Sequence, residues 1–272
     1  MTDAPFAFIE LPRERQAEKP RTSGLTMLAD FGMPLGQQQD VLELAGRYVD
    51  LAKIATGTAR LYEKSYLEKK LAAYREHRVR PFVGGQFQEY VFATQGWQAL
   101  EPFLREARAL GFDTVEISDN CVPLSDDERR RQIRIALDCG LAVFGEVGSK
   151  DDRSAAADLL RQAEVCFAAG CELVLVEASE LVEDGVPNRA MLEALRRELD
   201  IARVLFELPG PWISGVTLAQ VSDLKKLLIA EFGPAVNLAN LKPDDLIETE
   251  ALRVGLGVVG PKGRRVEPAS SG

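Results

Sequence analysis

The stretch TVEISDNCVPLSDDERRRQIRIALDCGLAVFGEV, Thr114–Val147, predicts the fold. It opens on a short apolar run, passes through a longer segment with helical spacing, and closes on a second apolar run. Ser125 and Glu128 have the spacing of a capping box, and Gly140 is a typical helix end. A strand, a helix and a second strand in this order are typical of the βα unit of a parallel sheet.

The same alternation recurs along the chain at intervals of roughly 25–35 residues. The predicted strands are Gly24–Asp30, Val49–Ala55, Val79–Val83, Thr114–Ser118, Leu141–Val147, Leu173–Glu177, Val204–Leu208 and Ala235–Leu238. Eight βα units fit a closed (β/α)8 barrel, whereas an open doubly wound sheet usually has about five to seven strands. The doubly wound alternative would also need a GxGxxG motif after the first strand, and Asp30–Gly36 does not supply one.

We therefore predict an α/β protein with a single TIM barrel over residues 24–258. An N-terminal extension at residues 1–23 would precede the barrel, and a C-terminal tail at residues 259–272 would follow it. We see no linker rich in proline or serine that would divide the barrel into two domains.

The charge balance and hydropathy exclude two classes of partner. The 272 residues include 33 Lys and Arg against 42 Asp and Glu, which gives a net charge of −9. Proteins that bind nucleic acid normally carry a basic excess or a basic face, so we expect none here. We also expect no membrane partner, because no uncharged apolar run approaches the roughly 18–20 residues that cross a bilayer. The N-terminus lacks the pattern of a signal peptide, which favours a cytoplasmic protein.

The residue types available for chemistry are few. The four cysteines form no CxxC pair and the chain has a single histidine, His77, which argues against a zinc site or a histidine-based triad. Any chemistry must therefore depend on carboxylates, lysines and amides.

Polar residues collect where the predicted strands end, which is the side of a TIM barrel that carries the active site. They are Asp30, Lys53, Gly84, Gly85, Glu116, Asp119, Glu146, Lys150, Glu177, Glu207, Asn237 and Asn240. Charges inside a barrel need partners, and a divalent cation or a lysine would compensate the glutamates. Oxygen ligands without His or Cys favour Mg²⁺. We predict Glu116, Glu146, Glu177 and Glu207 as its ligands, with structural ion pairs as the alternative for any one of them.

Several motifs, taken together, resemble the phosphosulfolactate synthase family from about residue 19 to 257. They are KPRTSGLT (Lys19–Thr26), Val49–Thr58, Gly84-Gly85 with Glu89-Tyr90, VEISD (Val115–Asp119), EVGSK (Glu146–Lys150), FELP (Phe206–Pro209) and VNLAN (Val236–Asn240). The resemblance implies a TIM barrel and a Mg²⁺-dependent addition of sulfite to phosphoenolpyruvate, which gives (2R)-3-sulfolactate 2-phosphate on the route to coenzyme M. The family also includes plant heat-stress-associated proteins.

The resemblance also implies roles for individual residues. Lys150 would protonate the central carbon, Lys53 would bind the sulfonate or carboxylate, and Glu146 would act in both catalysis and metal binding. The remaining predicted contacts to a small anionic carboxylate substrate are Asp30, Gly84, Gly85, Asp119, Asn237 and Asn240. We also expect a homo-oligomer, because barrels commonly associate.

Departures from the family pattern concern the phosphate. Ser179 and Gly257 stand where family members usually have arginine, and Phe31 follows Asp30 where lysine or asparagine is usual. Arg253 or the tail residues Lys262, Arg264 and Arg265 would be replacements if they reached the mouth. Three interpretations stay open: the synthase itself, a related lyase that acts on a non-phosphorylated unsaturated carboxylate, and a non-catalytic binding barrel.

Overall fold

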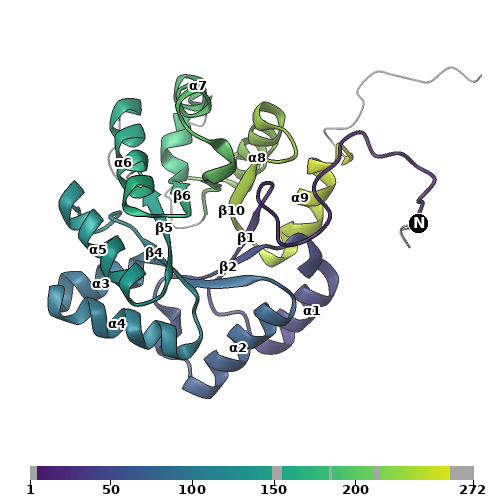
Figure 1. Ribbon diagram of the computed structural model, residues 1–272. Helices are drawn as coiled ribbons and strands as arrows, with labels where there is room; N and C mark the ends of the chain where they lie inside the picture. Colours follow the sequence, from purple (N-terminus) through teal and green to yellow (C-terminus); the bar gives the residue numbers. More distant parts are fainter. Residues whose placement is uncertain (1–4, 149–154, 184–185, 211–214, 258–272) are drawn as a thin grey trace, which may run out of the picture.

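Eight parallel strands close into a barrel in the computed structural model of the chain (Figure 1). The structure describes residues 5–148, 155–183, 186–210 and 215–257. The barrel strands, in order around the barrel, are β1 (Thr26–Asp30), β2 (Leu51–Ile54), β3 (Arg80–Val83), β4 (Thr114–Ile117), β5 (Ala142–Val147), β6 (Leu173–Val176), β9 (Val204–Glu207) and β10 (Asn237–Leu241). Pairing of β10 with β1 closes the barrel, which confirms the predicted TIM barrel.

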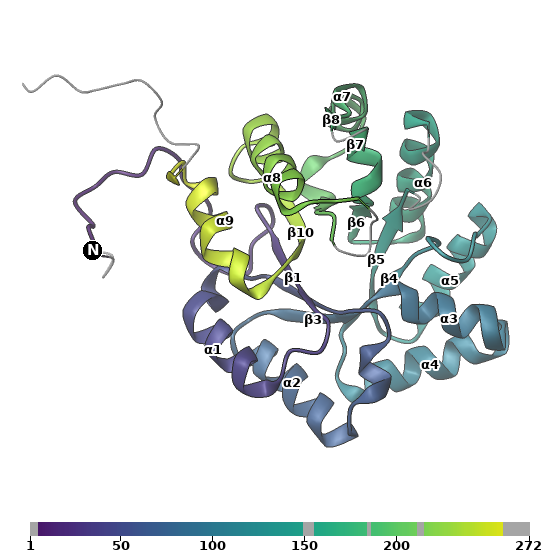
Figure 2. The same cartoon turned by 180° about the vertical axis from the view of Figure 1, so that it is seen from behind.

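Helices form a ring around these strands, as Figures 1 and 2 show from opposite sides. They are α1 (Leu35–Ala45), α2 (Lys64–Glu76), α3 (Gly85–Gln95), α4 (Trp97–Leu110), α5 (Asp126–Asp138), α6 (Ala156–Ala169), α7 (Arg189–Glu198), α8 (Leu218–Phe232) and α9 (Leu246–Arg253). Short 3₁₀ helices are η1 (Gly46–Tyr48), η2 (Thr58–Leu61), η3 (Ala178–Leu181), η4 (Ile201–Arg203) and η5 (Pro243–Asp245). A small antiparallel hairpin, β7 (Val182–Glu183) with β8 (Val186–Pro187), forms a separate sheet that the sequence analysis did not predict.

Two apolar cores follow from the alternation of side chains along the strands. The smaller core fills the barrel interior and consists of Leu25, Met27, Leu51, Phe82, Phe144, Leu175, Leu205 and Ala239. Inside it, the rings of Phe82 and Phe144 meet edge to face with their centroids 5.1 Å apart. The larger core lies between strands and helices, where outward residues such as Val115 join helix residues such as Leu104.

The predicted strand positions agree with the structure for seven barrel strands, and the eighth is shifted. The structure places β10 at Asn237–Leu241 rather than at Ala235–Leu238. The capping box of α5 is confirmed, because Glu128 N–H donates to Ser125 Oγ at 3.3 Å and Ser125 N–H donates to Glu128 Oε2 at 2.9 Å. The shift of β10 changes the role of Asn237, as described below.

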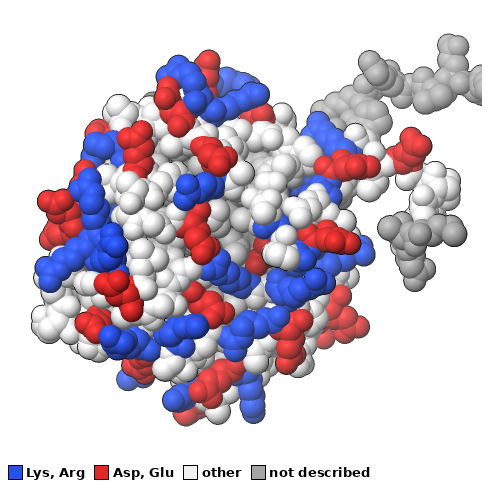
Figure 3. All heavy atoms as spheres, viewed as in Figure 1, with Lys and Arg blue, Asp and Glu red and all other residues white. Residues whose placement is uncertain are grey.

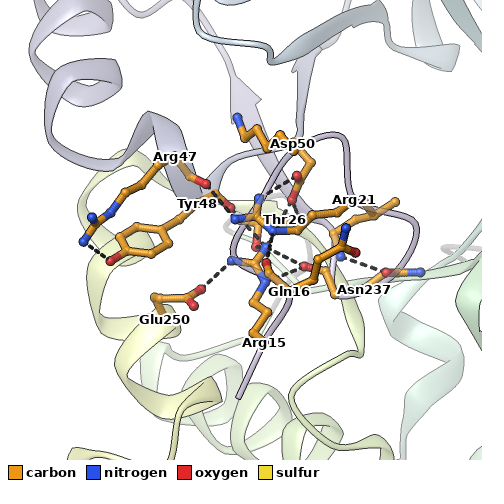
Figure 4. A network of polar contacts seen from close by, with 12 residues as sticks. Arg15, Gln16, Arg21, Thr26, Arg47, Tyr48, Asp50, Asn237 and Glu250 are labelled. Carbon is orange, nitrogen blue, oxygen red and sulfur yellow. Dashed lines mark hydrogen bonds and ion pairs between the residues drawn. The ribbon is translucent and has the colours of Figure 1, made fainter. Parts of the chain in front are cut away.

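The chain before β1 packs against the N-terminal end of the barrel (Figure 4). Asp50, which directly precedes β2, accepts hydrogen bonds from Arg21 Nη1 at 2.8 Å and from Arg15 Nη2 at 3.1 Å. Arg15 Nη1 also pairs with Glu250 of α9 at 2.6 Å. These buried ion pairs hold the N-terminal segment to both β2 and α9.

Figure 3 shows how the charged side chains are distributed on one face of the molecule. On the face seen in Figure 3, basic and acidic side chains are interleaved, and the described residues of that view form no basic face. A search of the described residues also finds no helix that is long and apolar enough to span a membrane.

Candidate active site

A polar layer lies directly above the apolar layer inside the barrel. Side chains two positions apart on a strand face the same side, so each apolar residue of the interior is followed by an inward polar residue nearer the C-terminal end. The pairs are Leu51 and Lys53, Phe144 and Glu146, Leu175 and Glu177, and Leu205 and Glu207. The sequence therefore brings one lysine and three glutamates from four strands to the mouth of the barrel.

Three carboxylates of this layer form a potential metal-ligand group. Ligand oxygens of Glu146, Glu177 and Glu207 all lie within 4.8 Å of one another, and all three residues are buried. Buried carboxylates so close together repel one another unless a cation or a proton neutralises them. The oxygen-only donor set fits Mg²⁺ better than zinc. Of the four predicted ligands, the structure thus brings three together in one group.

The fourth predicted ligand, Glu116, has different partners. Its Oε2 lies 2.8 Å from Lys53 Nζ, and its Oε1 accepts a hydrogen bond from the Gly85 N–H at 2.8 Å. Burial raises the pKa of Glu116 to about 8, against the opposing effect of Lys53. Both oxygens of Glu116 are therefore engaged by Lys53 and Gly85, and this glutamate is not part of the three-carboxylate group.

Lys53 is shared among the carboxylates. Its Nζ also lies 3.2 Å from Glu207 Oε1. Burial alone would lower the pKa of the Lys53 ammonium, but the surrounding glutamates raise it well above its usual value. The lysine therefore stays charged, and its single charge cannot balance all the glutamates of the polar layer.

Two glycines let the start of α3 approach this layer. A Cβ at Gly85 would lie 2.2 Å from Ser118 Oγ and 2.8 Å from Glu116 Oε1, so one of these groups would have to move. A Cβ at Gly84 would lie 3.2 Å from Lys53 Cε. The Gly84-Gly85 pair predicted from the sequence therefore lies at the site, where it makes room for the Lys53–Glu116 ion pair.

A cavity of about 70 Å³ opens above the polar layer. Its lining residues are Phe31, Lys53, Ala55, Thr56, Gly84, Gln86, Glu146, Glu207 and Asn240. Asn240, at the end of β10, thus lies where the sequence analysis placed it. Thr56 and Gln86 were missed. Gln86 follows the glycine pair, which could have drawn attention to it, whereas the left-handed backbone of Thr56, with φ of 52°, has no signal in the sequence.

Asp30 does not face this cavity, which corrects its predicted role in substrate binding. Its Oδ2 lies 2.8 Å from Lys70 Nζ and accepts a hydrogen bond from the Tyr74 hydroxyl at 2.7 Å. Its Oδ1 accepts from the N–H groups of Gly32 and Met33. Alternation along β1 turns Asp30 outward, so this carboxylate packs α2 against the barrel.

Asn237 also lies elsewhere, at the N-terminal start of β10. Its Oδ1 accepts a hydrogen bond from the Leu25 N–H at 2.8 Å, and its Nδ2 donates to the Val204 carbonyl at 2.8 Å. Both bonds tie neighbouring strands together at the end opposite the mouth. The predicted substrate contact is corrected, because the strand begins at this residue instead of ending near it.

Asp119 lies in the loop after β4 and binds Arg129 of α5. The other guanidinium nitrogen of Arg129, Nη1, donates to the Glu146 carbonyl at 2.9 Å. Through Arg129, Asp119 therefore supports the strand that carries Glu146. Asp119 is not among the cavity-lining residues. Lys150, predicted as the proton donor, lies outside the described residues.

The loop after β4 has a second support that the sequence analysis did not assign. Glu89 of α3 is buried, and its Oε2 accepts hydrogen bonds from the N–H groups of Cys121 and Val122 at 2.6 and 2.9 Å. Its other oxygen accepts from the Ser118 hydroxyl. The position of a glutamate on a helix gave no indication that it would hold a loop at the barrel mouth.

Comparison with known proteins assigns the chain to a family. The model of the (2R)-phospho-3-sulfolactate synthase (ComA) family matches residues 14–258. The chain belongs to the phosphosulfolactate synthase family. The strands that carry the polar layer all lie within the matched residues.

Relatives within the phosphosulfolactate synthase family cover nearly the whole chain. A phosphosulfolactate synthase of Methanothermobacter thermautotrophicus is 33% identical over 262 residues, which is 92% of this chain and 95% of the relative. A phosphosulfolactate synthase of Bacillus subtilis is 31% identical and covers 91% of this chain and 95% of the relative. The protein HEAT-STRESS-ASSOCIATED 32 of Arabidopsis thaliana is 27% identical, with 88% and 89% covered. This chain is therefore similar both to synthases and to a plant protein with a different description.

Solved structures support the fold alone. A 3-hexulose-6-phosphate synthase matches 86% of this chain and 100% of its own length with a TM-score of 0.52 at 16% identity. A dihydrodipicolinate synthase of Agrobacterium tumefaciens matches 85% of this chain and 73% of its own with the same TM-score at 14% identity.

Proposed function

We propose that this protein is a lyase of the phosphosulfolactate synthase type, which adds sulfite to phosphoenolpyruvate with the help of Mg²⁺. The observation that carries the proposal is the group of three buried carboxylates beside Lys53 at the barrel mouth. Family membership supports this kind of lyase. The sulfite sulfur would form a bond to the methylene carbon, the π electrons would move toward the carboxylate, and the central carbon would then take up one proton.

The chain's own residues fit the charges of this reaction. Glu146, Glu177 and Glu207 would hold Mg²⁺, which supplies a Lewis acid for the substrate carboxylate. Lys53 borders the same cavity and would orient an anionic oxygen of the substrate while its ion pair with Glu116 fixes the ammonium. Gln86, Thr56 and Asn240 offer neutral hydrogen-bonding groups at the cavity wall. The proposed proton donor is Lys150.

A second candidate is addition to, or elimination from, a non-phosphorylated unsaturated carboxylate. The observation that favours it is the cavity wall, where Lys53 is the one cation among the described lining residues and already pairs with two carboxylates. Ser179 and Gly257 replace two arginines that the family pattern predicts, which reduces the positive charge available for a phosphate. Phe31 adds an apolar surface at the same wall.

An activity assay separates these candidates. The purified protein is incubated with Mg²⁺, sulfite and either phosphoenolpyruvate or a non-phosphorylated carboxylate such as acrylate or fumarate, and sulfonated products are measured by mass spectrometry. We expect product from phosphoenolpyruvate that is lost with Glu146→Gln, Lys150→Ala or EDTA. The exposed Glu172→Gln is the matched control and should keep its activity. Product from acrylate or fumarate alone would favour the second candidate. The absence of product from every substrate would favour a binding barrel.

A further inference from the structure

A second, larger hollow adjoins the candidate active site. It has a volume of about 670 Å³ and shares Phe31 and Asn240 with the inner cavity. Its other lining residues are Ala29, Gly32, Met33, Pro34, Gln37, Lys242, Pro243 and Asp244. Because the two hollows share Phe31 and Asn240, a ligand bound beside the glutamates can extend past these residues into the outer hollow.

The inner and outer hollows differ in size. The inner cavity has a volume of about 70 Å³, against about 670 Å³ for the outer hollow. If the substrate carboxylate and reacting carbons lie beside Lys53 and the glutamates, the outer hollow has room for the distal group.

Lys242 provides an available positive charge in the outer hollow. Its side chain is exposed and, within the described part of the chain, makes no ion pair or hydrogen bond, although Asp244 lines the same hollow. Lys53 differs, because it is held by two carboxylates. Arg253, the other cation considered from the sequence, is fully buried at the opposite end of the barrel, where it donates to the Val236 and Leu25 carbonyls. Arg253 therefore cannot serve as a phosphate contact at the mouth.

The position of Lys242 also fits an anion site. It follows β10, the eighth strand of the barrel, and TIM barrels frequently bind phosphate in the loops after their seventh and eighth strands. Across the hollow, α1 begins after Pro34 with no side-chain cap and no acidic residue in its first turn. No carboxylate of that turn would therefore repel an anion bound near Lys242.

We propose that the outer hollow is the subsite for the phosphoryl group of the substrate, with Lys242 as its cationic contact. In this arrangement Lys242 takes over a function of the arginines that Ser179 and Gly257 replace, while Phe31 and Asn240 separate the phosphoryl group from the reacting carbons. This inference rests on the proposed function, because it concerns the binding of the same substrate.

Equilibrium binding tests it without need of turnover. Isothermal titration calorimetry in the presence of Mg²⁺ compares phosphoenolpyruvate with pyruvate, which has the carboxylate but no phosphoryl group. For Lys242→Met we expect phosphoenolpyruvate to bind at least about tenfold more weakly, because a charge-assisted contact is lost. Pyruvate should bind within twofold of the wild-type value. Lys242→Arg should retain phosphoenolpyruvate binding within about threefold, since it keeps the charge. Lys226→Met, on α8, is the matched control and should change neither ligand.

Several outcomes would overturn the inference. They are unchanged phosphoenolpyruvate binding in Lys242→Met, equal weakening of both ligands, or a folded wild-type protein that binds phosphoenolpyruvate no more tightly than pyruvate. The sulfonation assay is read separately. Product formed by Lys242→Met with an unchanged KM would remove this subsite and leave the proposed function standing. Charge-dependent phosphoenolpyruvate binding without any sulfonated product would keep the subsite and remove the proposed reaction.

Discussion

Within the described residues, each end of the barrel buries more charges of one sign than of the other, with opposite signs and different surroundings at the two ends. Among the described residues at the mouth, the acidic cluster of Glu116, Glu146, Glu177 and Glu207 outnumbers its one cation, Lys53, and the pKa of Glu116 is raised to about 8 by burial. At the N-terminal end, the cations Arg15, Arg21 and Arg253 exceed Asp50 and Glu250, and burial lowers the pKa of Arg253 to about 9. The same physics acts at both ends, because burial disfavours a charge that lacks a full set of partners.

The difference lies in what surrounds each cluster. Arg21 donates to the backbone carbonyls of Gln16, Ala17 and Arg47 (Figure 4). Arg253 also donates to backbone carbonyls, so the chain itself supplies the partners of the cationic cluster. The acidic cluster borders a cavity. An excess of positive charge that is surrounded by backbone carbonyls contributes to the stability of the fold. An excess of negative charge that faces a cavity indicates a cationic ligand.

The largest effect should come from the mouth. Glu177→Gln removes one ligand charge, so we expect activity to fall by roughly 10²–10³-fold, as for other losses of an electrostatic contact in a site. Mg²⁺ affinity, measured by calorimetry, should fall with it. The exposed Glu172→Gln is the control. Unchanged Mg²⁺ binding in Glu177→Gln would mean that the three carboxylates do not act as one ligand group.

Substitutions at the N-terminal end of the barrel should lower stability and leave Mg²⁺ binding unchanged. Asp50→Asn leaves Arg15 and Arg21 buried without their common carboxylate, so we expect the free energy of unfolding to fall by about 3–5 kcal/mol. Urea denaturation measures this. Asp127→Asn breaks an exposed pair with Arg130 and should change stability by less than about 1 kcal/mol. Equal effects of the two variants would contradict the enclosed character of the cluster.

A pH titration of stability probes the acidic cluster directly. Because burial raises the pKa of Glu116 from 4.5 to about 8, the folded state holds a proton that the unfolded state releases. The free energy of unfolding should therefore decrease as pH rises from about 4.5 to 8 and then level off, on a scale of about 1.36 kcal/mol per pKa unit. The raised pKa of Lys53 does not contribute to this pH dependence, because it changes the protonation of the lysine only above the usual lysine pKa of 10.5.

The control for this titration is Glu116→Gln, which has no proton to release. Measured by urea denaturation in EDTA, the variant should lose most of the decrease between pH 4.5 and 8. A wild-type slope that persists unchanged in Glu116→Gln would assign the titration to another group.

The smallest effect should come from the approach of α3 to the mouth. Gly85→Ala places a methyl group against Ser118 and Glu116, so we expect a loss of about 1–3 kcal/mol in stability. Gly36→Ala is the matched control, because its added Cβ meets nothing within 4 Å in α1, and it should be neutral or slightly stabilising. Thermal unfolding of both variants gives the comparison, and similar melting temperatures would show that the start of α3 can move.

The sequence predicted the barrel and most of the acidic cluster for one reason, the period of two along short buried strands. Lys53, Glu146, Glu177 and Glu207 each follow an apolar residue by two positions, so strand assignment alone placed them inside. Asp30 lay beyond this reasoning, because its direction depends on which face of β1 is inward. Asn237 depended on a shift of two residues in the start of β10.

Other parts of the site could not be predicted because they depend on chain geometry. The left-handed backbone of Thr56, with a φ of 52°, occurs at a β-branched residue type that rarely adopts it. In the sequence, Arg253 is an ordinary basic residue in the last turn of a helix. Only the packing of α9 shows that it is buried under β1 and β10.

Because Arg15 and Arg21 form buried ion pairs, the part of the chain that folds as a unit begins before the first strand. A shortened chain that begins at Gly24 would retain every strand of the barrel, yet it would bury Asp50 without either arginine and would leave Glu250 without its partner. We expect this shortened chain not to be recovered as a soluble, folded protein, even though it keeps every strand. The minimal independently stable unit therefore begins no later than Arg15, ahead of its first strand.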